Sequence, residues 1–417
     1  MPATASRLAF HGGPRAVATP APRWPVTGDW EVRAMEEVVR SGAWSWNGQH
    51  ERAFCKEFAE FIGAKHCLAL CNGTVTLQCA LQGVGVVPGD EVIVPGLTWV
   101  ATAQAALDIG ANVVFADIDP ETLCLDRHSF EKAITQRTKA VIPVHLYGCM
   151  ADMDAIMEIS RRHGLKVVED VAHQHGSRWR NTGAGAIGDA GSFSMQQSKV
   201  LTSGEGGAVT TNDDKVYEIV HCLKQVGHNP QMVPGNRYGH NYRITEMQAV
   251  LLRGGMQRIE AQTRRREEAA ARFAEGLARI GGPLRAVARD PRITRQAYYC
   301  VTLYYDESKA RGISKDAYAR ALHAEGCPLG GTYAPVYRAP LMNLYDATSP
   351  VPFRDPTKIQ DYRALKLPNV ERAVASTALL LSHTHLLGDD AYIDELIRAV
   401  EKVNEALPEL LKKQEAA

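Results

Sequence analysis

Long apolar runs, a net charge and paired cysteines are all missing from this 417-residue chain. No stretch reaches the ~18 apolar residues of a membrane span, and residues 1–25 lack the apolar core of a signal peptide. Lysine plus arginine (47) equals aspartate plus glutamate (47), which disfavours nucleic acid or an anionic membrane as a partner. The nine cysteines form no CxxC pair, as is typical of reduced thiols. We therefore expect a soluble, cytoplasmic protein without membrane or nucleic-acid partners.

What the chain does contain is a regular alternation of strand-like and helical patterns from about Phe54 to residue 250. β-Branched runs alternating with helices are typical of a mostly parallel sheet covered by helices. The length is too great for one ordinary hydrophobic core. We expect an α/β fold with an N-terminal arm at 1–30, a large domain at 31–255 and a smaller C-terminal α+β domain at 256–417.

A long helical pattern at 245–280 would connect the two domains. Gly254 and Gly255 weaken this pattern, because glycine is a poor helix former. The charged run RRREE at 264–268 reads as a solvated face of the same helix.

Three polar segments follow predicted strands, where open α/β sheets place their ligands. The first is CNGT at residues 71–74, between a strand and a helix. The backbone amides of Gly73 and Thr74 would point out of the helix N-terminus, which is a seat for a phosphate group. An ordinary N-cap turn is the simpler reading of this segment by itself.

The second segment is EDVAHQHG at 169–176, in which the apolar strand KVVE delivers Asp170 at its carboxyl end. A carboxylate there could pair with a pyridinium nitrogen and keep it protonated, as pyridoxal phosphate requires of a protein. The alternative is an aspartate that caps the next segment. His173 and His175 invite a metal reading, but no third ligand follows at metal spacing, and we expect no metal.

The third segment is GSFSMQQSKVLTSGEGGAVTT, in which Lys199 stands alone among small and neutral polar residues. A desolvated amine beside a cofactor would have its pKa lowered toward ~7 to 8, which suits a nucleophilic or general-base lysine. An ordinary loop lysine is the alternative.

These three segments occur in the order of phosphate seat, strand-end aspartate and lysine, and as a set the chain resembles the DegT/DnrJ/EryC1/StrS aminotransferases. The resemblance covers about residues 30–400. It implies a fold type I pyridoxal-phosphate transferase with a seven-stranded, mostly parallel sheet. It also implies that Lys199 forms the internal aldimine with pyridoxal 5′-phosphate, that Asp170 binds the pyridine nitrogen and that His173 lies beside the phenolic oxygen.

By the same resemblance, Trp99 stacks on the cofactor ring, while Gly73, Thr74 and Ser194 bind its phosphate. Asn241 in HNYRITEMQA would reach the phosphate of the neighbouring subunit, which implies a homodimer with shared active sites. Two alternatives stay open: Trp99 could be a core residue. Asn241 could cap the helix that begins near Thr245.

The segment SMQQSKVLTSGEGGA resembles the enzymes that transfer nitrogen from L-glutamine to scyllo-inosose or 2-deoxy-scyllo-inosose during aminoglycoside assembly. A keto-cyclitol acceptor is therefore expected, with L-glutamine or L-glutamate as amino donor. A nucleotide-keto-sugar aminotransferase is the alternative, and Arg237 or Arg338 could serve its diphosphate. An amino-hydroxybenzoate synthase and a non-catalytic regulatory protein are further alternatives.

Acceptor-binding residues of this family usually fall in the segments that read GAWSWNGQHERAF, GTYAPVYRAPLMN and LLLSHTHLL here. Turns and core packing are the alternative for each of them.

Overall fold

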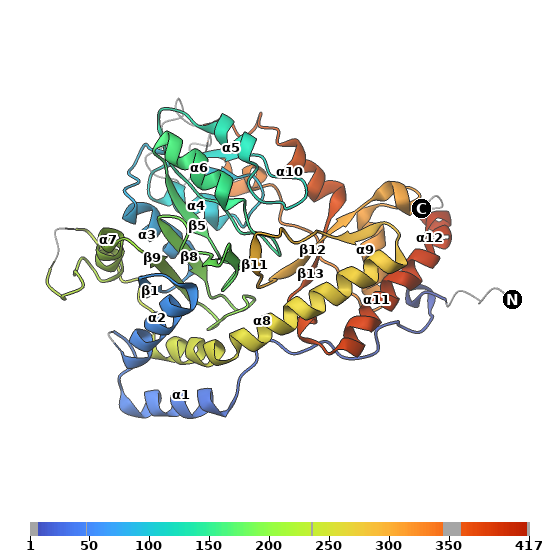
Figure 1. The fold of residues 1–417 in the computed structure, drawn as a ribbon, viewed down its shortest axis with the longest axis horizontal. Helices are drawn as coiled ribbons and strands as arrows, with labels where there is room; N and C mark the ends of the chain where they lie inside the picture. Colours follow the sequence, from blue (N-terminus) through green and yellow to red (C-terminus); the bar gives the residue numbers. More distant parts are fainter. Residues whose placement is uncertain (1–6, 47, 235–236, 345–359, 415–417) are drawn as a thin grey trace.

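The computed structural model describes residues 7–46, 48–234, 237–344 and 360–414. A seven-stranded sheet forms the centre of the larger domain (Figure 1). Its spatial order is β1 (His66–Leu70), β9 (Gly207–Thr211), β8 (Ala190–Ser194), β5 (Lys166–Asp170), β4 (Thr138–Val141), β2 (Glu91–Pro95) and β3 (Asn112–Ala116). Strand β9 pairs antiparallel with β1 and β8, and every other pairing in the sheet is parallel, so the predicted mostly parallel sheet is confirmed.

Helices cover this sheet on both sides, as its buried apolar strands require. They are α2 (Gln49–Ile62), α3 (Gly73–Gly83), α4 (Ala101–Asp108), α5 (Arg127–Ala133), α6 (Met153–His163) and α7 (Asp214–Lys224). Helix α3 packs against α4 and α7, whereas α5 packs against α6. The core of this domain is formed by the apolar faces of these helices and both faces of the strands. Helix α1 (Asp29–Ser41) lies apart from the sheet and packs against α8 (Glu246–Ile280) in a small cluster of its own.

A second core belongs to the C-terminal part of the chain. Its antiparallel sheet has the order β10 (Leu284–Ala286), β12 (Cys300–Tyr305) and β13 (Ala378–Ser382). The helices of this part are α9 (Lys315–Ala324), α10 (Pro368–Arg372), α11 (Asp390–Glu405) and α12 (Leu407–Gln414). The short strand β11 (Ile293–Arg295) joins β6 (Arg178–Trp179) and β7 (Thr182–Gly183) in a third sheet that links the two parts.

One helix, α8 (Glu246–Ile280), runs from the large domain into the smaller one without a break (Figure 1). The long helix expected at 245–280 is therefore present, and Gly254 and Gly255 do not interrupt it. A Cβ atom on Gly254 would lie 2.3 Å from the Oε1 atom of Glu31, so this glycine lets α1 approach α8 closely. We propose that the boundary between the large domain and the smaller one lies within α8, between residues 255 and 256.

The reading of 264–268 as a solvated face is wrong for Arg266, whose side chain is fully buried. Its Nε atom donates to the carbonyl oxygen of Ala297 over 2.9 Å. This hydrogen bond ties α8 to the segment that precedes β12. The periodicity of the sequence cannot reveal this contact, since it joins residues 31 positions apart.

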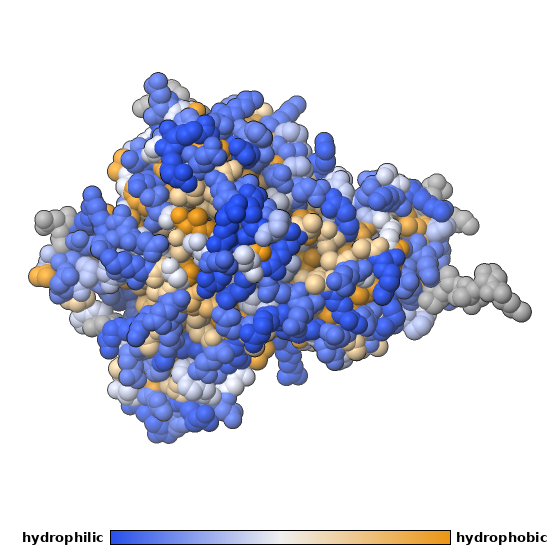
Figure 2. Space-filling view, in the orientation of Figure 1, coloured by the Kyte–Doolittle hydropathy of each residue, from blue (hydrophilic) through white to orange (hydrophobic). Residues whose placement is uncertain are grey.

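No helix among the described residues is both long and apolar enough to cross a bilayer. Figure 2 shows a mostly hydrophilic face, in which apolar residues occur as separate patches.

Candidate active site

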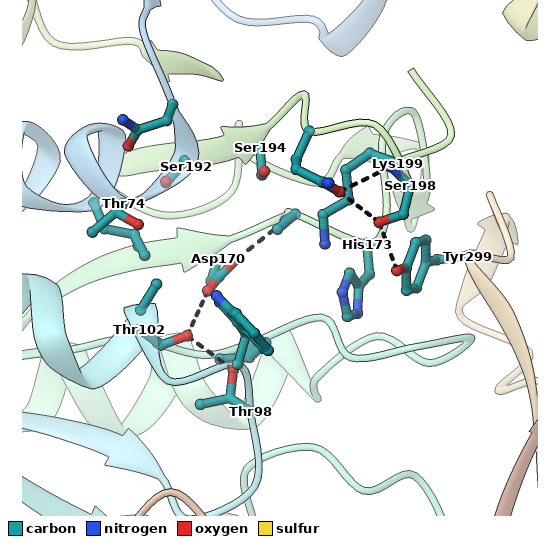
Figure 3. A pocket seen from close by; sticks show the side chains of 18 of the residues that line it. Thr74, Thr98, Thr102, Asp170, His173, Ser192, Ser194, Ser198, Lys199 and Tyr299 are labelled. Carbon is teal, nitrogen blue, oxygen red and sulfur yellow. Dashed lines mark hydrogen bonds between the residues drawn. The ribbon is translucent and has the colours of Figure 1, made fainter. Parts of the chain in front are cut away.

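A cavity of about 350 Å³ lies at the carboxyl ends of the parallel strands. Asp170 ends β5 and Ser194 ends β8, so adjacent strands in the sheet deliver both residues to the same edge. The smaller domain closes the cavity with Tyr299 and Tyr333. Figure 3 shows how Lys199, His173 and Tyr299 converge on one side of it.

Lys199 is buried in this cavity with 8% of its surface exposed. Its Nζ atom lies 4.7 Å from the centre of the Tyr299 ring. Loss of hydration lowers the pKa of this amine to about 8, while the charge of Asp170 acts in the opposite direction. The pKa is lowered as the sequence predicted, and an amine that is partly neutral near pH 8 can act as a nucleophile and can accept a proton.

Asp170 is held by two hydrogen bonds. Its Oδ2 atom accepts from Thr102 Oγ1 over 2.8 Å, and its Oδ1 atom accepts from the backbone amide of Ala172 over 3.1 Å. Thr98 Oγ1 lies 2.9 Å from Thr102 Oγ1 and extends the network. Burial raises the pKa of Asp170, whereas both hydrogen bonds and the Lys199 charge lower it. The carboxylate is thus fixed in position and faces the cavity rather than solvent.

Gly73, Thr74 and Ser194 also line the cavity, and Figure 3 shows Thr74 on the side away from Lys199 and Tyr299. Asn72 caps α3 by accepting from the Val75 amide over 2.9 Å. Gly73 and Thr74 are the first residues of the helix, so their amides lie outside its own hydrogen-bond ladder. A Cβ atom on Gly73 would stand 2.6 Å from the Cβ atom of Ser194. Only glycine therefore lets the serine approach this helix N-terminus, where an anion binds favourably.

His173 is buried between aromatic rings. Its Nδ1 atom accepts from the Tyr147 amide over 3.1 Å, so the neutral ring carries its proton on Nε2. That Nε2 atom lies 3.3 Å from the hydroxyl of Tyr333. The ring of Tyr299 stacks on the imidazole at 4.0 Å, and burial lowers the pKa of His173 well below its usual value. The imidazole is therefore a neutral donor inside the site.

Trp99 lines the cavity with 57% of its surface exposed, so it is not a core residue. Its ring lies 5.3 Å from that of Tyr333. Asn241 is exposed and does not belong to the cavity lining. It does not cap α8 either, because Thr245 does so through a capping box with Gln248.

Sequence reasoning missed Thr98, Thr102 and Tyr299, all of which line the cavity. The threonines carry a weak signal, since they stand four residues apart at the start of a helix that follows a strand. The tyrosine carries none, because AYYCVTLYY reads as an ordinary strand.

The three segments expected to bind the acceptor differ in whether they line the cavity. Tyr333 of the second segment lines the cavity, whereas Trp44 and Trp46 of the first do not. His383 of the third segment is not part of the cavity lining, and its Nε2 atom lies 2.9 Å from the carbonyl oxygen of Ser198, the residue before Lys199.

No group of His, Cys, Asp and Glu side chains among the described residues is placed to hold a metal ion. The Nε2 atom of His175 donates to the Ser194 carbonyl oxygen over 2.8 Å. The two histidines of EDVAHQHG are thus engaged with the protein.

We predict that replacing Asp170 by asparagine lowers the pKa of Lys199 below about 8, because the carboxylate charge stabilises the ammonium form. Only the neutral amine is acylated, so the labelling rate of Lys199 at each pH reports its pKa. Competitive acetylation of cofactor-free protein, read by mass spectrometry against the other lysines, measures the shift. An unchanged or raised pKa in Asp170→Asn would show that the two side chains do not interact.

Comparison with known proteins agrees with this geometry. The model of the DegT/DnrJ/EryC1/StrS aminotransferase family matches residues 26–394. An L-glutamine:2-deoxy-scyllo-inosose aminotransferase from Streptomyces lividus is 39% identical, over 96% of this chain and 98% of that protein.

Two solved structures have the same fold. 3-Amino-5-hydroxybenzoic acid synthase is 31% identical with a TM-score of 0.80, covering 92% of this chain and 99% of that one. DesV of S. venezuelae, solved in complex with a ketimine intermediate, is 33% identical with a TM-score of 0.77, covering 90% and 94%. The chain therefore belongs to the DegT/DnrJ/EryC1/StrS aminotransferase family and is a pyridoxal-phosphate-dependent aminotransferase of fold type I.

Proposed function

We propose that this enzyme moves the amino group of L-glutamine to the ketone of a cyclitol such as 2-deoxy-scyllo-inosose or scyllo-inosose. The observation that carries the proposal is the buried amine of Lys199, which shares with Asp170 a cavity otherwise lined by uncharged side chains and by Glu205. The name of the S. lividus relative supports both the donor and the acceptor.

The residues present fit pyridoxal 5′-phosphate. The helix N-terminus at Gly73 and Thr74, with Ser194 beside it, offers amides and a hydroxyl to a phosphate group. Asp170 and Lys199 lie between that seat and the smaller domain (Figure 3). When bound, this cofactor supplies an electron sink for the charge that develops as the donor loses its α-proton. Trp99 at the mouth of the cavity would cover the face of the ring.

Each charged residue then has a separate task. Asp170 would keep a proton on the cofactor's pyridine nitrogen, and its bonds to Thr102 and Ala172 hold the carboxylate in place. Lys199 would hold the cofactor covalently. Its amine, once free, would move a proton at the α-carbon of the donor, a task suited to a pKa of about 8. His173, which carries its proton on Nε2, would offer a hydrogen bond to the cofactor.

A neutral acceptor fits the cavity better than a nucleotide-sugar. Among the described residues that line it, Lys199 is the one cation, and the cofactor engages that amine. Arg338 donates to the carbonyl oxygens of Arg363 and Leu365, and Arg237 borders a different hollow. Neither arginine is placed to bind a diphosphate in the site of its own chain. Hydroxyl and aromatic groups, such as Tyr333, suit a polyol.

We predict that L-glutamine labelled with ¹⁵N at its α-amino group delivers the label to 2-deoxy-scyllo-inosose, giving a ¹⁵N-amine detectable by mass spectrometry. Lys199→Ala should give no product, because no other amine reaches the cofactor. A label transferred only to a nucleotide-keto-sugar would overturn the acceptor assignment. An ultraviolet-absorbing aromatic product would instead indicate an amino-hydroxybenzoate synthase.

We further propose that two copies share their active sites, with Asn241 of each copy binding the phosphate in the other. The cavity lining of one chain lacks Asn241, and the Asn241 side chain is exposed. The preceding segment also exposes apolar side chains, with Val226 at 52%, Val233 at 51% and Tyr238 at 81%. Exposed apolar groups of this kind mark a surface that a partner covers.

Subunit mixing tests the shared site. Lys199→Ala and Asn241→Ala are each expected to be nearly inactive as homodimers. An equimolar mixture that exchanges subunits should recover about a quarter of the wild-type activity, because half the dimers are mixed and each contains one intact site. No recovery, despite subunit exchange shown by native mass spectrometry, would mean that Asn241 acts within its own chain.

A further inference from the structure

The backbone that carries Lys199 is held by an unusual run of hydrogen bonds. Every carbonyl oxygen from Ser194 to Ser198 accepts at least one hydrogen bond. Two of these oxygens accept from amides of the same segment, residues 194–204, which we call the lysine segment. The amide of Ser203 donates to Met195 over 3.1 Å, and the amide of Lys199 donates to Gln196 over 2.9 Å. The other three accept from ring N–H groups outside the segment.

The three outside donors come from three separate parts of the chain. His175 Nε2 lies 2.8 Å from the Ser194 oxygen and belongs to the large domain. Trp24 Nε1 donates to the Gln197 oxygen over 3.0 Å and belongs to the N-terminal arm. His383 Nε2 lies 2.9 Å from the Ser198 oxygen and follows β13 in the smaller domain.

Trp24 and His383 also contact each other. Their rings pack edge to face with centroids 4.7 Å apart and planes at 89°. This geometry is favourable for aromatic pairs. The two donors that hold the two peptide units directly before Lys199 are thus joined into one structural unit, which we call the Trp24–His383 clamp.

The N-terminal arm that bears Trp24 is itself fixed to the smaller domain. Leu8 and Val17 are buried in the core of that domain. The buried carboxylate of Glu325 accepts from the amides of Ala9 over 2.7 Å and Ala16 over 3.0 Å, and Lys402 Nζ lies 2.8 Å from it. The contacts of the arm with the smaller domain therefore hold Trp24 next to the lysine segment.

The histidine of the clamp has a defined protonation state. A carbonyl oxygen can only accept, so the Nε2 atom of His383 must carry the proton. Its ring is 2% exposed, and burial together with the charge of Arg266 lowers the pKa of His383 to about 3. The imidazole is therefore neutral at neutral pH and donates to Ser198.

We propose that Trp24 and His383 are positioning residues, which hold the backbone of Lys199 in place while its side chain leaves the cofactor and moves a proton. The clamp also makes the placement of the lysine depend on the docking of the smaller domain and of the N-terminal arm. The role of the lysine in this statement rests on the proposed function, whereas the restraint on the backbone does not.

Hydrogen exchange of the full-length protein tests the restraint without reference to activity. Trp24→Phe and His383→Phe keep an aromatic ring but remove the N–H donor. Each is expected to speed exchange in peptides spanning 195–204 by about fivefold, as expected for one lost hydrogen bond. Trp179→Phe is the matched control, because this buried indole donates to Asp154 over 3.0 Å and lies away from the lysine segment.

Kinetics of amino-group removal from L-glutamine test the consequence for Lys199. The two clamp variants are expected to lower the rate at saturating donor by about fivefold, with the half-saturating donor concentration unchanged. His383→Gln restores a side-chain N–H donor and should recover part of the loss.

The proposal is overturned if exchange at 195–204 stays at the wild-type rate in both clamp variants, or if Trp179→Phe changes it equally. It is also overturned if His383→Gln shows the same exchange rate and the same rate at saturating donor as His383→Phe, because packing of the His383 ring alone would then explain the effect. If the wild type turns over no amino donor, the proposed function fails, but the exchange experiment still decides whether the clamp exists.

Discussion

Burial of the Lys199 amine opposite the carboxylate of Asp170 is the constraint on which the rest of this structure depends. Removing an amine from water is unfavourable, and here it lowers the pKa to about 8. The protein maintains that burial from two sides. The parallel sheet brings β5 and β8 together at one edge, and the smaller domain places Tyr299 and Tyr333 over the remaining side. Neither domain forms the site by itself.

The parts of the site that could be predicted are those encoded locally. An apolar strand that ends in Asp170, a helix start at Gly73 and a lysine among small residues each leave a short pattern in the sequence. The order of strands in the sheet then brings the three patterns to one edge, as parallel topology requires. The mostly parallel sheet was predictable for the same reason, since strand and helix periods alternate along the chain.

What could not be predicted depends on contacts between distant residues. Tyr299 and Arg266 lie in segments whose periodicity indicates an ordinary strand and an exposed helix face, yet one lines the cavity and the other is buried. Gly254 resembles a helix breaker, whereas in the structure it admits the side chain of Glu31. Trp24 stands 175 residues from the lysine that it restrains, and its segment has no regular period at all.

These long-range contacts show what each part of the chain contributes to the site. The large domain supplies Asp170, Lys199 and the helix N-terminus at Gly73, while the smaller domain and the arm add Tyr299, Tyr333 and the Trp24–His383 clamp. The most direct test of the central claim is reduction of the holoenzyme with borohydride, followed by peptide mapping. The account predicts that the mass of the reduced cofactor appears on the peptide that contains Lys199 and disappears in Lys199→Ala. Attachment at any other lysine, or at none, would contradict it.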